Sequence, residues 1–293
     1  MGGDRISEDA IVFAGGALDR APQVRADAGA LDAALRDPAA RAVAVGPAGA
    51  HRKLLPLRPD DHAGALFLGL APEGPRFAVE RDDVELTGLR ELTASLPAGA
   101  LGVVAYAAAL ANWARATRFC GRCGEPTEPA EAGHVRVCAN GHQHHPRTDP
   151  VVIMLVTSGD VVLMGRQASW PEGRYSALAG FVEPGESLEA AVAREVAEEA
   201  GVEVTDVRYV ASQPWPFPVS LMLGFQATYA GGDPAPRDAE LQDVRWFCRD
   251  EVAAAAREDV AWEDAGGAGR LRLPPRSAIA RVLVERWLGA PAG

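Results

Sequence analysis

The sequence contains no run rich in lysine or arginine, although it is 293 residues long. Its 29 basic residues are outnumbered by 40 acidic ones, which gives a formal net charge of −11 at pH 7. An acidic chain repels polyanions unless basic residues gather locally. The composition therefore does not favour extended binding of nucleic acid.

A membrane-spanning segment and an apolar signal core are also missing. The longest apolar run, residues 99–114, is shorter than the roughly 20 residues that a membrane-spanning helix needs. The first ten residues are polar and charged. We therefore expect a buried helix at 98–118 and no membrane partner.

Cysteine is scarce, with four residues in the chain, and three of these lie between positions 120 and 138. Such a cluster suits a metal site in a reducing compartment better than a disulfide framework, so a cytoplasmic location is expected. The fourth, Cys248, follows Trp246 and Phe247 and is expected to be a buried thiol.

Apolar periodicity predicts a mixture of strands and helices. Short apolar runs separated by Gly, Pro and Asp fill the first hundred residues and predict a small sheet. Two apolar runs, 151–156 and 161–166, are joined by a short turn and predict a hairpin. Helices are expected at 188–200, at 249–258 and, beginning at proline, at 274–288.

Changes in composition and in the pattern of apolar residues divide the sequence into three parts. We expect a small α/β N-terminal domain at 1–115, a cysteine-bearing segment at 116–147 and a larger domain at 148–293. The fold class is therefore α/β in the α+β sense, with strands and helices mixed along the chain.

Three glutamates share one face of the helix expected at 188–200. Glu195, Glu198 and Glu199 stand at i, i+3 and i+4, so their like charges lie side by side. A divalent cation such as Mg²⁺ or Mn²⁺ would relieve the repulsion, because these ions prefer oxygen ligands. The alternative is a solvated acidic face without a ligand. Ser187 is the expected N-cap, and Gly201 the expected C-terminal stop.

The segment around this helix resembles the Nudix box, G-x5-E-x7-R-E-U-x-E-E-x-G-U with U aliphatic. Every defined position is filled, by Gly180, Glu186, Arg194, Glu195, Val196, Glu198, Glu199, Gly201 and Val202. The resemblance implies an α/β/α sandwich and metal-assisted hydrolysis of a nucleoside diphosphate linked to another group.

The same resemblance assigns roles to individual residues. It implies that Glu195, Glu198 and Glu199 bind the Mg²⁺ or Mn²⁺ ion and that Glu186 and Arg194 form a structural salt bridge. The segment RDAELQDVRWF resembles the one in which relatives of this family place a further metal-binding and catalytic glutamate, which implies that role for Glu240; a plain loop acid is the alternative.

The cysteine cluster has the spacing of three-quarters of a zinc ribbon. Cys120 and Cys123 form C-x2-C, and Cys138 follows, but the usual fourth cysteine is missing. His142 is the first candidate to replace it, and His144 is the second. We expect a structural Zn²⁺, with a site that has lost its metal as the alternative.

Residues 212–222 read SQPWPFPVSLM, in which three prolines stiffen a segment that carries Trp215 and Phe217. A zinc ribbon, a Nudix box and this motif together resemble the NADH pyrophosphatases. A stiff connector whose aromatic rings fill the core is the alternative interpretation. The resemblance implies substrate contacts from Phe181, Gln213, Trp215, Phe217, Ser220 and Ala280.

The resemblance implies hydrolysis of NAD(H) to NMN(H) and AMP, commonly by a homodimer. The alternative is removal of an NAD cap from the 5′ end of RNA by the same chemistry. A non-catalytic nucleotide sensor is a third hypothesis, but sensors can dispense with the metal-binding glutamates, whereas this box is intact.

Overall fold

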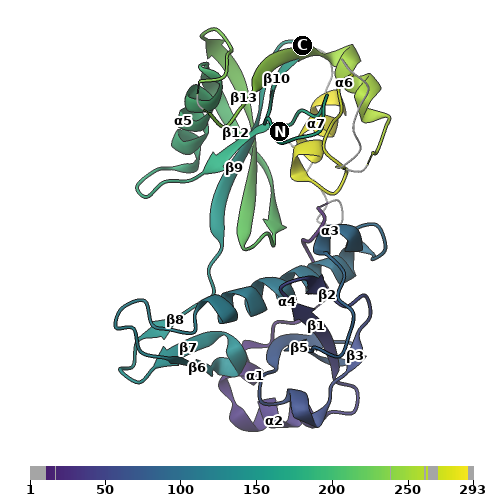
Figure 1. Cartoon of the computed structure of the whole chain (residues 1–293), viewed down its shortest axis with the longest axis vertical. Helices are drawn as coiled ribbons and strands as arrows, with labels where there is room; N and C mark the ends of the chain where they lie inside the picture. Colours follow the sequence, from purple (N-terminus) through teal and green to yellow (C-terminus); the bar gives the residue numbers. More distant parts are fainter. Residues whose placement is uncertain (1–10, 17, 238, 261, 263–269, 290–293) are drawn as a thin grey trace. The chain divides into compact units, whose positions relative to one another are not determined.

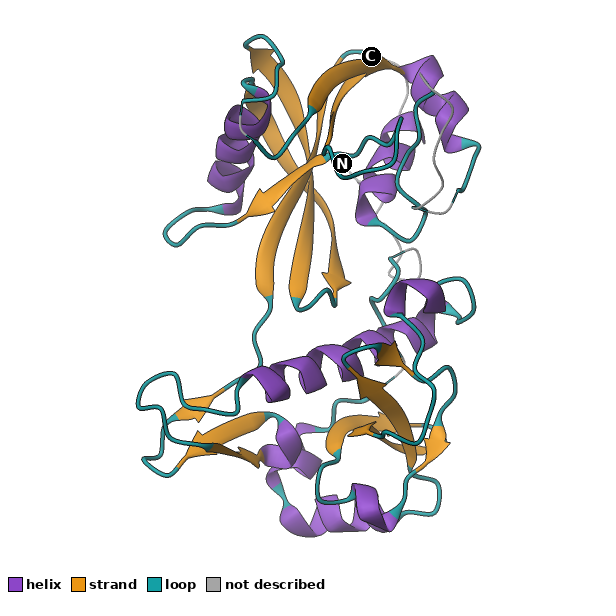
Figure 2. Cartoon of the chain, viewed as in Figure 1, coloured by secondary structure: helices purple, strands orange, loops and turns teal. Residues whose placement is uncertain are grey.

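The computed structural model describes residues 11–16, 18–237, 239–260, 262 and 270–289. The chain forms two compact units, each of which is described by itself (Figures 1 and 2). Unit 1 is formed mainly by Asp149–Gln213 and Leu221–Gly293. Unit 2 consists of Val12–Thr148 and Pro214–Ser220, so the proline-rich segment groups with the N-terminal part of the chain.

Unit 2 is built on a five-stranded sheet in the order β2-β1-β5-β4, with β3 also paired to β1. Its central pair, β1 and β5, is parallel. The strands are β1 (Arg41–Gly46), β2 (Gly49–Ala50), β3 (Leu55–Pro56), β4 (Leu66–Ala71) and β5 (Gly74–Glu80). The small sheet expected from the apolar runs is confirmed.

Helices of unit 2 cover this sheet. The longest, α4 (Ala98–Ala116), buries nine side chains or glycines, so the expectation of a buried helix here is confirmed. It packs with Val43, Val45 and Leu68 of the sheet in one apolar cluster. The other helical segments are α1 (Pro22–Ala26), α2 (Ala28–Arg36), η2 (Pro59–Asp61), α3 (Leu89–Leu92) and η3 (Glu131–Gly133).

The cysteine-bearing segment follows α4 and forms a three-stranded antiparallel sheet in the order β6-β7-β8. Its strands are β6 (Thr127–Ala130), β7 (Val135–Cys138) and β8 (Gln143–His144). It belongs to the same compact unit as the N-terminal part.

Unit 1 contains a six-stranded sheet in the order β12-β13-β9-β10-β14, with β11 paired to β9. The hairpin expected after residue 150 is confirmed as β9 and β10, which pair antiparallel. The strands are β9 (Asp149–Ser158), β10 (Val161–Arg166), β11 (Leu178–Phe181), β12 (Glu203–Trp215), β13 (Ser220–Gly231) and β14 (Asp243–Cys248).

Helices lie on both sides of the unit 1 sheet. Figure 1 shows α5 (Leu188–Ala200) on one side and α6 (Arg249–Ala256) with α7 (Ile279–Gly289) on the other. Val152 and Met154 alternate along β9 and pack with Val192 and Val196 of α5 in one buried cluster. The expected α/β/α sandwich is therefore present.

Two local expectations were wrong. The last helix begins at Ile279 rather than at the prolines, because residues 276–278 form a turn and the Gln213 side chain accepts the hydrogen bond from the Ile279 amide. Cys248 is exposed rather than buried, because β14 ends at this residue and α6 begins at the next. Among the described residues, no helix has the length and apolar character needed to cross a membrane.

Candidate active site and metal centre

The carboxylates of the candidate active site are carried by α5, whose two ends are defined by local contacts. The Ser187 hydroxyl accepts a hydrogen bond from the Ala190 amide, which caps the first turn. Gly201 ends the helix with φ 69°, and its amide donates to the Ala197 carbonyl. Both expectations for the helix ends are confirmed.

Glu186 and Arg194 form the expected salt bridge. Arg194 donates from Nε to Glu186 Oε1 at 2.7 Å and from Nη2 to Glu186 Oε2 at 2.9 Å, a two-point contact. Hydrogen bonding from Arg194 lowers the pKa of Glu186 to about 2. This ion pair joins the loop before α5 to the middle of the helix.

Arg194 also organises the neighbouring acids. Its Nη1 donates at 2.9 Å to both Glu195 Oε1 and Glu198 Oε2, and its Nη2 donates to the Phe181 carbonyl at 2.9 Å. One guanidinium therefore joins the end of β11 to the middle of α5 and holds two of the candidate metal ligands.

Glu195 lies in a partly desolvated position between other acids. Its side chain is only 13% exposed, and it lies against Gly180, where a Cβ atom would come within 1.9 Å of the Glu195 Cδ atom. Burial raises the pKa of Glu195; Arg194 opposes this effect, while the charges of Glu198 and Glu240 add to it. A cation bound here would remove this electrostatic cost.

Glu240, on the loop before β14, is therefore close enough for its charge to act on Glu195. The Gln167 amide donates from Nε2 to Glu240 Oε1 at 3.0 Å, which holds the carboxylate to the end of β10. Sequence reasoning missed Gln167, because a single glutamine after a strand has no distinctive spacing.

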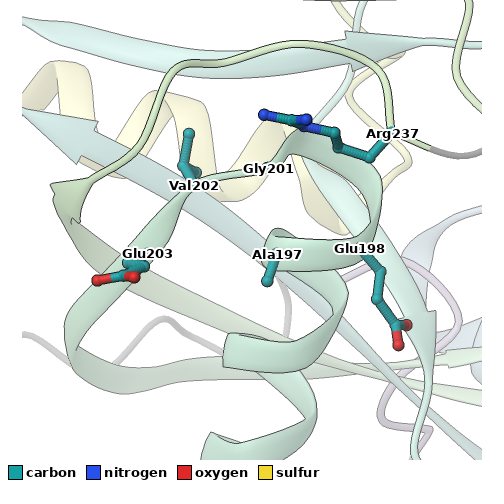
Figure 3. A pocket seen from close by; sticks show the side chains of 6 residues that line it. All are labelled: Ala197, Glu198, Gly201, Val202, Glu203 and Arg237. Atoms are coloured by element: carbon teal, nitrogen blue, oxygen red, sulfur yellow. The ribbon is translucent and has the colours of Figure 1, made fainter.

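Glu199 and Glu198 differ in their surroundings. Glu199 is 3% exposed, whereas Glu198 is exposed and lines a hollow of about 660 Å³ at the C-terminal end of α5 (Figure 3). Arg237 lies on the same wall, and its Nε would be 2.3 Å from a Cβ atom at Gly201. Arg237 was not anticipated, because a lone arginine in a loop carries no motif.

Three of the other candidate substrate residues lie on different elements of the structure. Phe181 ends β11 beside the acidic cluster, and its ring is 61% exposed, so it is open to a planar ligand. Ala280 is buried in the first turn of α7. Ser220, at the start of β13, groups with unit 2. Contact of these three residues with a substrate stays a prediction.

Gln213 is buried next to the start of α7. Its Nε2 donates to the Ser277 carbonyl at 2.9 Å, and its Oε1 accepts from the Ile279 amide at 2.8 Å. The side-chain amide thus joins β12 to α7 and caps that helix. Binding of substrate by Gln213 stays a prediction, since these contacts are structural.

Trp215 and Phe217 pack within unit 2. Their rings are 5.0 Å apart, and both lie edge-on to Phe13, at 6.1 and 5.9 Å respectively. The Arg90 guanidinium lies 4.6 Å from the centre of the Phe217 ring. These contacts favour the interpretation of the motif as an anchored connector, and its proposed role in selecting substrate stays a prediction.

The three clustered cysteines and His142 form a site whose four ligand atoms all lie within 4.8 Å of one another. Cys123 Sγ is 3.7 Å from Cys138 Sγ, and His142 Nδ1 is 3.5 Å from the sulfurs of both Cys120 and Cys138. Tetrahedral Zn²⁺ with bonds of about 2.3 Å to sulfur and 2.0 Å to nitrogen separates such atoms by about 3.5–3.8 Å. The residues therefore fit zinc.

His144 lies next to this group, with Nε2 3.2 Å from Cys120 Sγ. It is not among the four residues whose ligand atoms come together. The arrangement favours His142 as the fourth ligand and His144 as a hydrogen-bond partner of the Cys120 sulfur.

Two protein-family models match this chain. The model of the NUDIX domain matches residues 146–265, and that of the NADH pyrophosphatase zinc ribbon domain matches residues 115–145. Among solved structures, a NUDIX hydrolase from Nitrosomonas europaea aligns at 25% identity with a TM-score of 0.44, covering 60% of this chain and 96% of that one.

Two curated relatives carry the name NAD-capped RNA hydrolase NudC. The protein of Stutzerimonas stutzeri is 42% identical over 207 residues, which are 70% of this chain and 68% of that protein. The protein of Mycobacterium bovis is 50% identical over 192 residues, which are 63% of this chain and 59% of that protein. The chain belongs to the Nudix hydrolase family and carries the zinc ribbon of the NADH pyrophosphatases.

Proposed function

We propose that this protein hydrolyses the pyrophosphate bond of NAD(H), giving NMN(H) and AMP. The observation that carries the proposal is the acidic cluster, in which Glu195 is desolvated and subject to the charges of Glu198 and Glu240. Such a cluster suits a divalent cation, which a pyrophosphate substrate also requires. The zinc ribbon type and the names of the relatives support NAD(H) as the substrate.

The glutamates and Arg194 have different proposed roles. Glu195, Glu198, Glu199 and Glu240 would hold Mg²⁺ or Mn²⁺, which when bound neutralises phosphoryl oxygens and lowers the pKa of a coordinated water. Arg194 keeps Glu195 and Glu198 oriented through its two 2.9 Å hydrogen bonds. Hydrolysis places the hydroxyl of water on one phosphorus, and the other phosphate leaves with the bridging oxygen.

Substrate positioning rests on the exposed aromatic ring at the edge of the cluster. The Phe181 ring can stack on a nicotinamide, while its carbonyl is held by Arg194. The predicted contacts from Gln213, Trp215, Phe217, Ser220 and Ala280 remain part of the proposal.

A second candidate function is removal of an NAD cap from the 5′ end of RNA. It is favoured by the name of the curated relatives, NAD-capped RNA hydrolase, and it involves the same bond and the same carboxylates. We also propose a homodimer and a cytoplasmic location, the latter because thiols arranged for a metal suit a reducing compartment.

The test is a product analysis with Glu199→Gln as the inactive variant. Purified protein is incubated with NADH and Mg²⁺ or Mn²⁺, and products are identified by mass. Equal amounts of NMNH and AMP, lost in the variant, are expected. Glu189→Gln is the matched control, because Glu189 is an exposed acid in the first turn of the same helix.

Two outcomes separate the hypotheses. If wild-type protein binds NADH without cleaving it, the sensor hypothesis replaces the proposed function. If Glu199→Gln and Glu189→Gln lose activity equally, the acidic cluster does not carry the reaction.

A further inference from the structure

The zinc ribbon carries a slight excess of basic side chains in an acidic protein. Residues 116–147 contain four arginines and three glutamates, whereas the whole chain has a net charge of −11. The histidine in the zinc site adds to this difference, because Zn²⁺ with three thiolates and one imidazole carries one negative charge rather than the two of a four-thiolate site. A polyanion therefore meets less repulsion at the ribbon than the net charge of the whole chain implies.

An exposed aromatic ring lies between two of these arginines in the sequence. Phe119 is 65% exposed, and its backbone is fixed by a bridge to Pro126, just before the zinc ligand Cys120. Arg118 and Arg122 flank it in the sequence, and both are exposed. An isolated large ring on a rigid surface costs little ordering entropy when it stacks on another planar group.

The two flanking arginines are available for a ligand. Among the described residues, no ion pair or side-chain hydrogen bond involves Arg118 or Arg122, and both keep free guanidinium groups. In contrast, Arg115 is paired with Glu80, and the Nε and Nη2 atoms of Arg136 are bound to Thr117 and Thr127.

A hydrogen bond within the ribbon holds the backbone next to Arg118. Arg136 donates from Nε to the Thr117 carbonyl, which fixes the chain just before Arg118. Arg118 and Arg136 also line one hollow of about 390 Å³, whose acids include Asp61, already paired with Arg81. The arrangement gives two exposed positive groups and one exposed aromatic ring on a backbone that is held by hydrogen bonds.

We propose that Arg118, Phe119 and Arg122 form a binding surface for single-stranded RNA, with the ring stacking on a base and the arginines on phosphates. This inference rests on the second candidate function, the removal of NAD caps. Capped RNA extends for many nucleotides beyond the cleaved bond, whereas free NAD(H) does not. The surface therefore acts on capped RNA and leaves the hydrolysis of free NAD(H) unchanged.

The test compares two substrates in the full-length, zinc-loaded protein with Mn²⁺. Kinetic constants are measured for NADH and for a 20-nucleotide single-stranded RNA with a 5′ NAD cap. Arg118→Ala combined with Arg122→Ala, and separately Phe119→Leu, should raise KM for the capped RNA on the order of tenfold and leave kcat/KM for NADH unchanged. Phe119→Trp should retain the wild-type KM, because stacking is preserved.

The salt dependence gives an independent readout. Binding of the same RNA with a 5′ monophosphate is followed by fluorescence anisotropy between about 50 and 200 mM salt. The double arginine variant should reduce the slope of log affinity against log salt by about 1.4, since each phosphate contact on a single strand contributes about 0.7. Arg208→Ala is the matched control, because Arg208 is a 77%-exposed arginine in unit 1.

Several results would overturn the inference. These are an unchanged KM for capped RNA, an equal loss on both substrates, or an equal effect of Arg208→Ala. A change of molar mass by light scattering in Phe119→Leu would assign the ring to a protein interface instead. If wild-type protein cleaves neither substrate, the proposed function fails, but the anisotropy measurement still decides whether this surface binds RNA.

Discussion

A Cβ atom at Gly180 would lie 1.9 Å from Cδ of Glu195 and about as close to both carboxylate oxygens, at 2.1 and 2.2 Å. The first glycine of the Nudix box therefore leaves room for the Glu195 carboxylate, because any side chain at position 180 would displace that carboxylate. The requirement arises from contact and not from backbone conformation.

This relationship predicts the effect of Gly180→Ala. The atoms in the way belong to the end of a flexible side chain, so the carboxylate moves aside and the fold is retained. We expect affinity for Mn²⁺ to fall by about 10–100-fold, as it does when the orientation of a metal ligand is lost. Titration with Mn²⁺, followed by electron paramagnetic resonance, measures this change.

The matched control is Gly185→Ala. Gly185 has φ 96° but open space around its Cβ position, so this variant strains the loop without touching Glu195. If Gly185→Ala weakens Mn²⁺ binding as much as Gly180→Ala, the contact with Glu195 is not the cause.

The zinc site predicts different effects for its two neighbouring histidines. His142 Nδ1 lies 3.5 Å from the sulfurs of Cys120 and Cys138, which is the separation expected between two ligands of one zinc ion. His144, in contrast, approaches only the sulfur of Cys120. We expect His142→Ala to lower the zinc content well below one per chain and to lower the melting temperature, because metal binding stabilises the fold. His144→Ala should retain zinc, as measured by mass spectrometry of the metal.

A third variant tests the assignment of His142 by replacing it with another zinc ligand instead of removing it. His142→Cys should keep one zinc ion per chain and, with Co²⁺ in its place, show stronger thiolate absorption than wild type. Zinc retained in His142→Ala and lost in His144→Ala would reverse the assignment.

His134 predicts a pH dependence of stability. Its Nε2 donates to the Phe67 carbonyl at 2.7 Å and its Nδ1 accepts from Arg25 Nη1 at 3.0 Å, so the ring is neutral. Burial lowers the pKa of His134 from its ordinary 6.5. As the pH falls below 6.5, the unfolded chain binds a proton that the folded chain does not, so the free energy of unfolding decreases.

The measurement is urea unfolding between pH 5 and 8. His134→Gln should remove up to about 1.4 kcal/mol of this change per pH unit, the contribution of one proton. His145→Gln serves as the control, since His145 is exposed. Parallel stability curves for wild type and His134→Gln would show that His134 is not responsible.

The sequence predicted the catalytic half of the molecule well, because its signals are local. The spacing of Glu195, Glu198 and Glu199 along one helix, with Ser187 and Gly201 at its ends, depends on residues within one or two turns of each other. The same is true of the β9–β10 hairpin.

Contacts between distant residues could not be predicted in this way. Phe13 lies about 200 positions before Trp215, and no periodicity connects the two. The motif predicts a substrate contact for Gln213, which stays a prediction, but no sequence pattern indicates that its amide caps α7 more than 60 residues later. Burial of such groups is decided by packing of the folded chain, which single-sequence patterns do not contain.

The packing of the proline motif gives the last prediction, a double-mutant cycle on Trp215 and Phe13. Trp215→Ala should lower the free energy of unfolding by about 2 kcal/mol, because a half-buried ring is removed from an apolar cluster. Phe13→Ala should lower it by about 3–5 kcal/mol, because this ring is buried, and the pair should show a coupling of about 1 kcal/mol, typical of edge-on aromatic contacts. Denaturation of the four proteins measures this coupling. Additive effects on the free energy of unfolding would show that the two rings do not stabilise each other. A rise in KM for NADH in Trp215→Phe, with stability retained, would instead support the predicted contact of Trp215 with substrate.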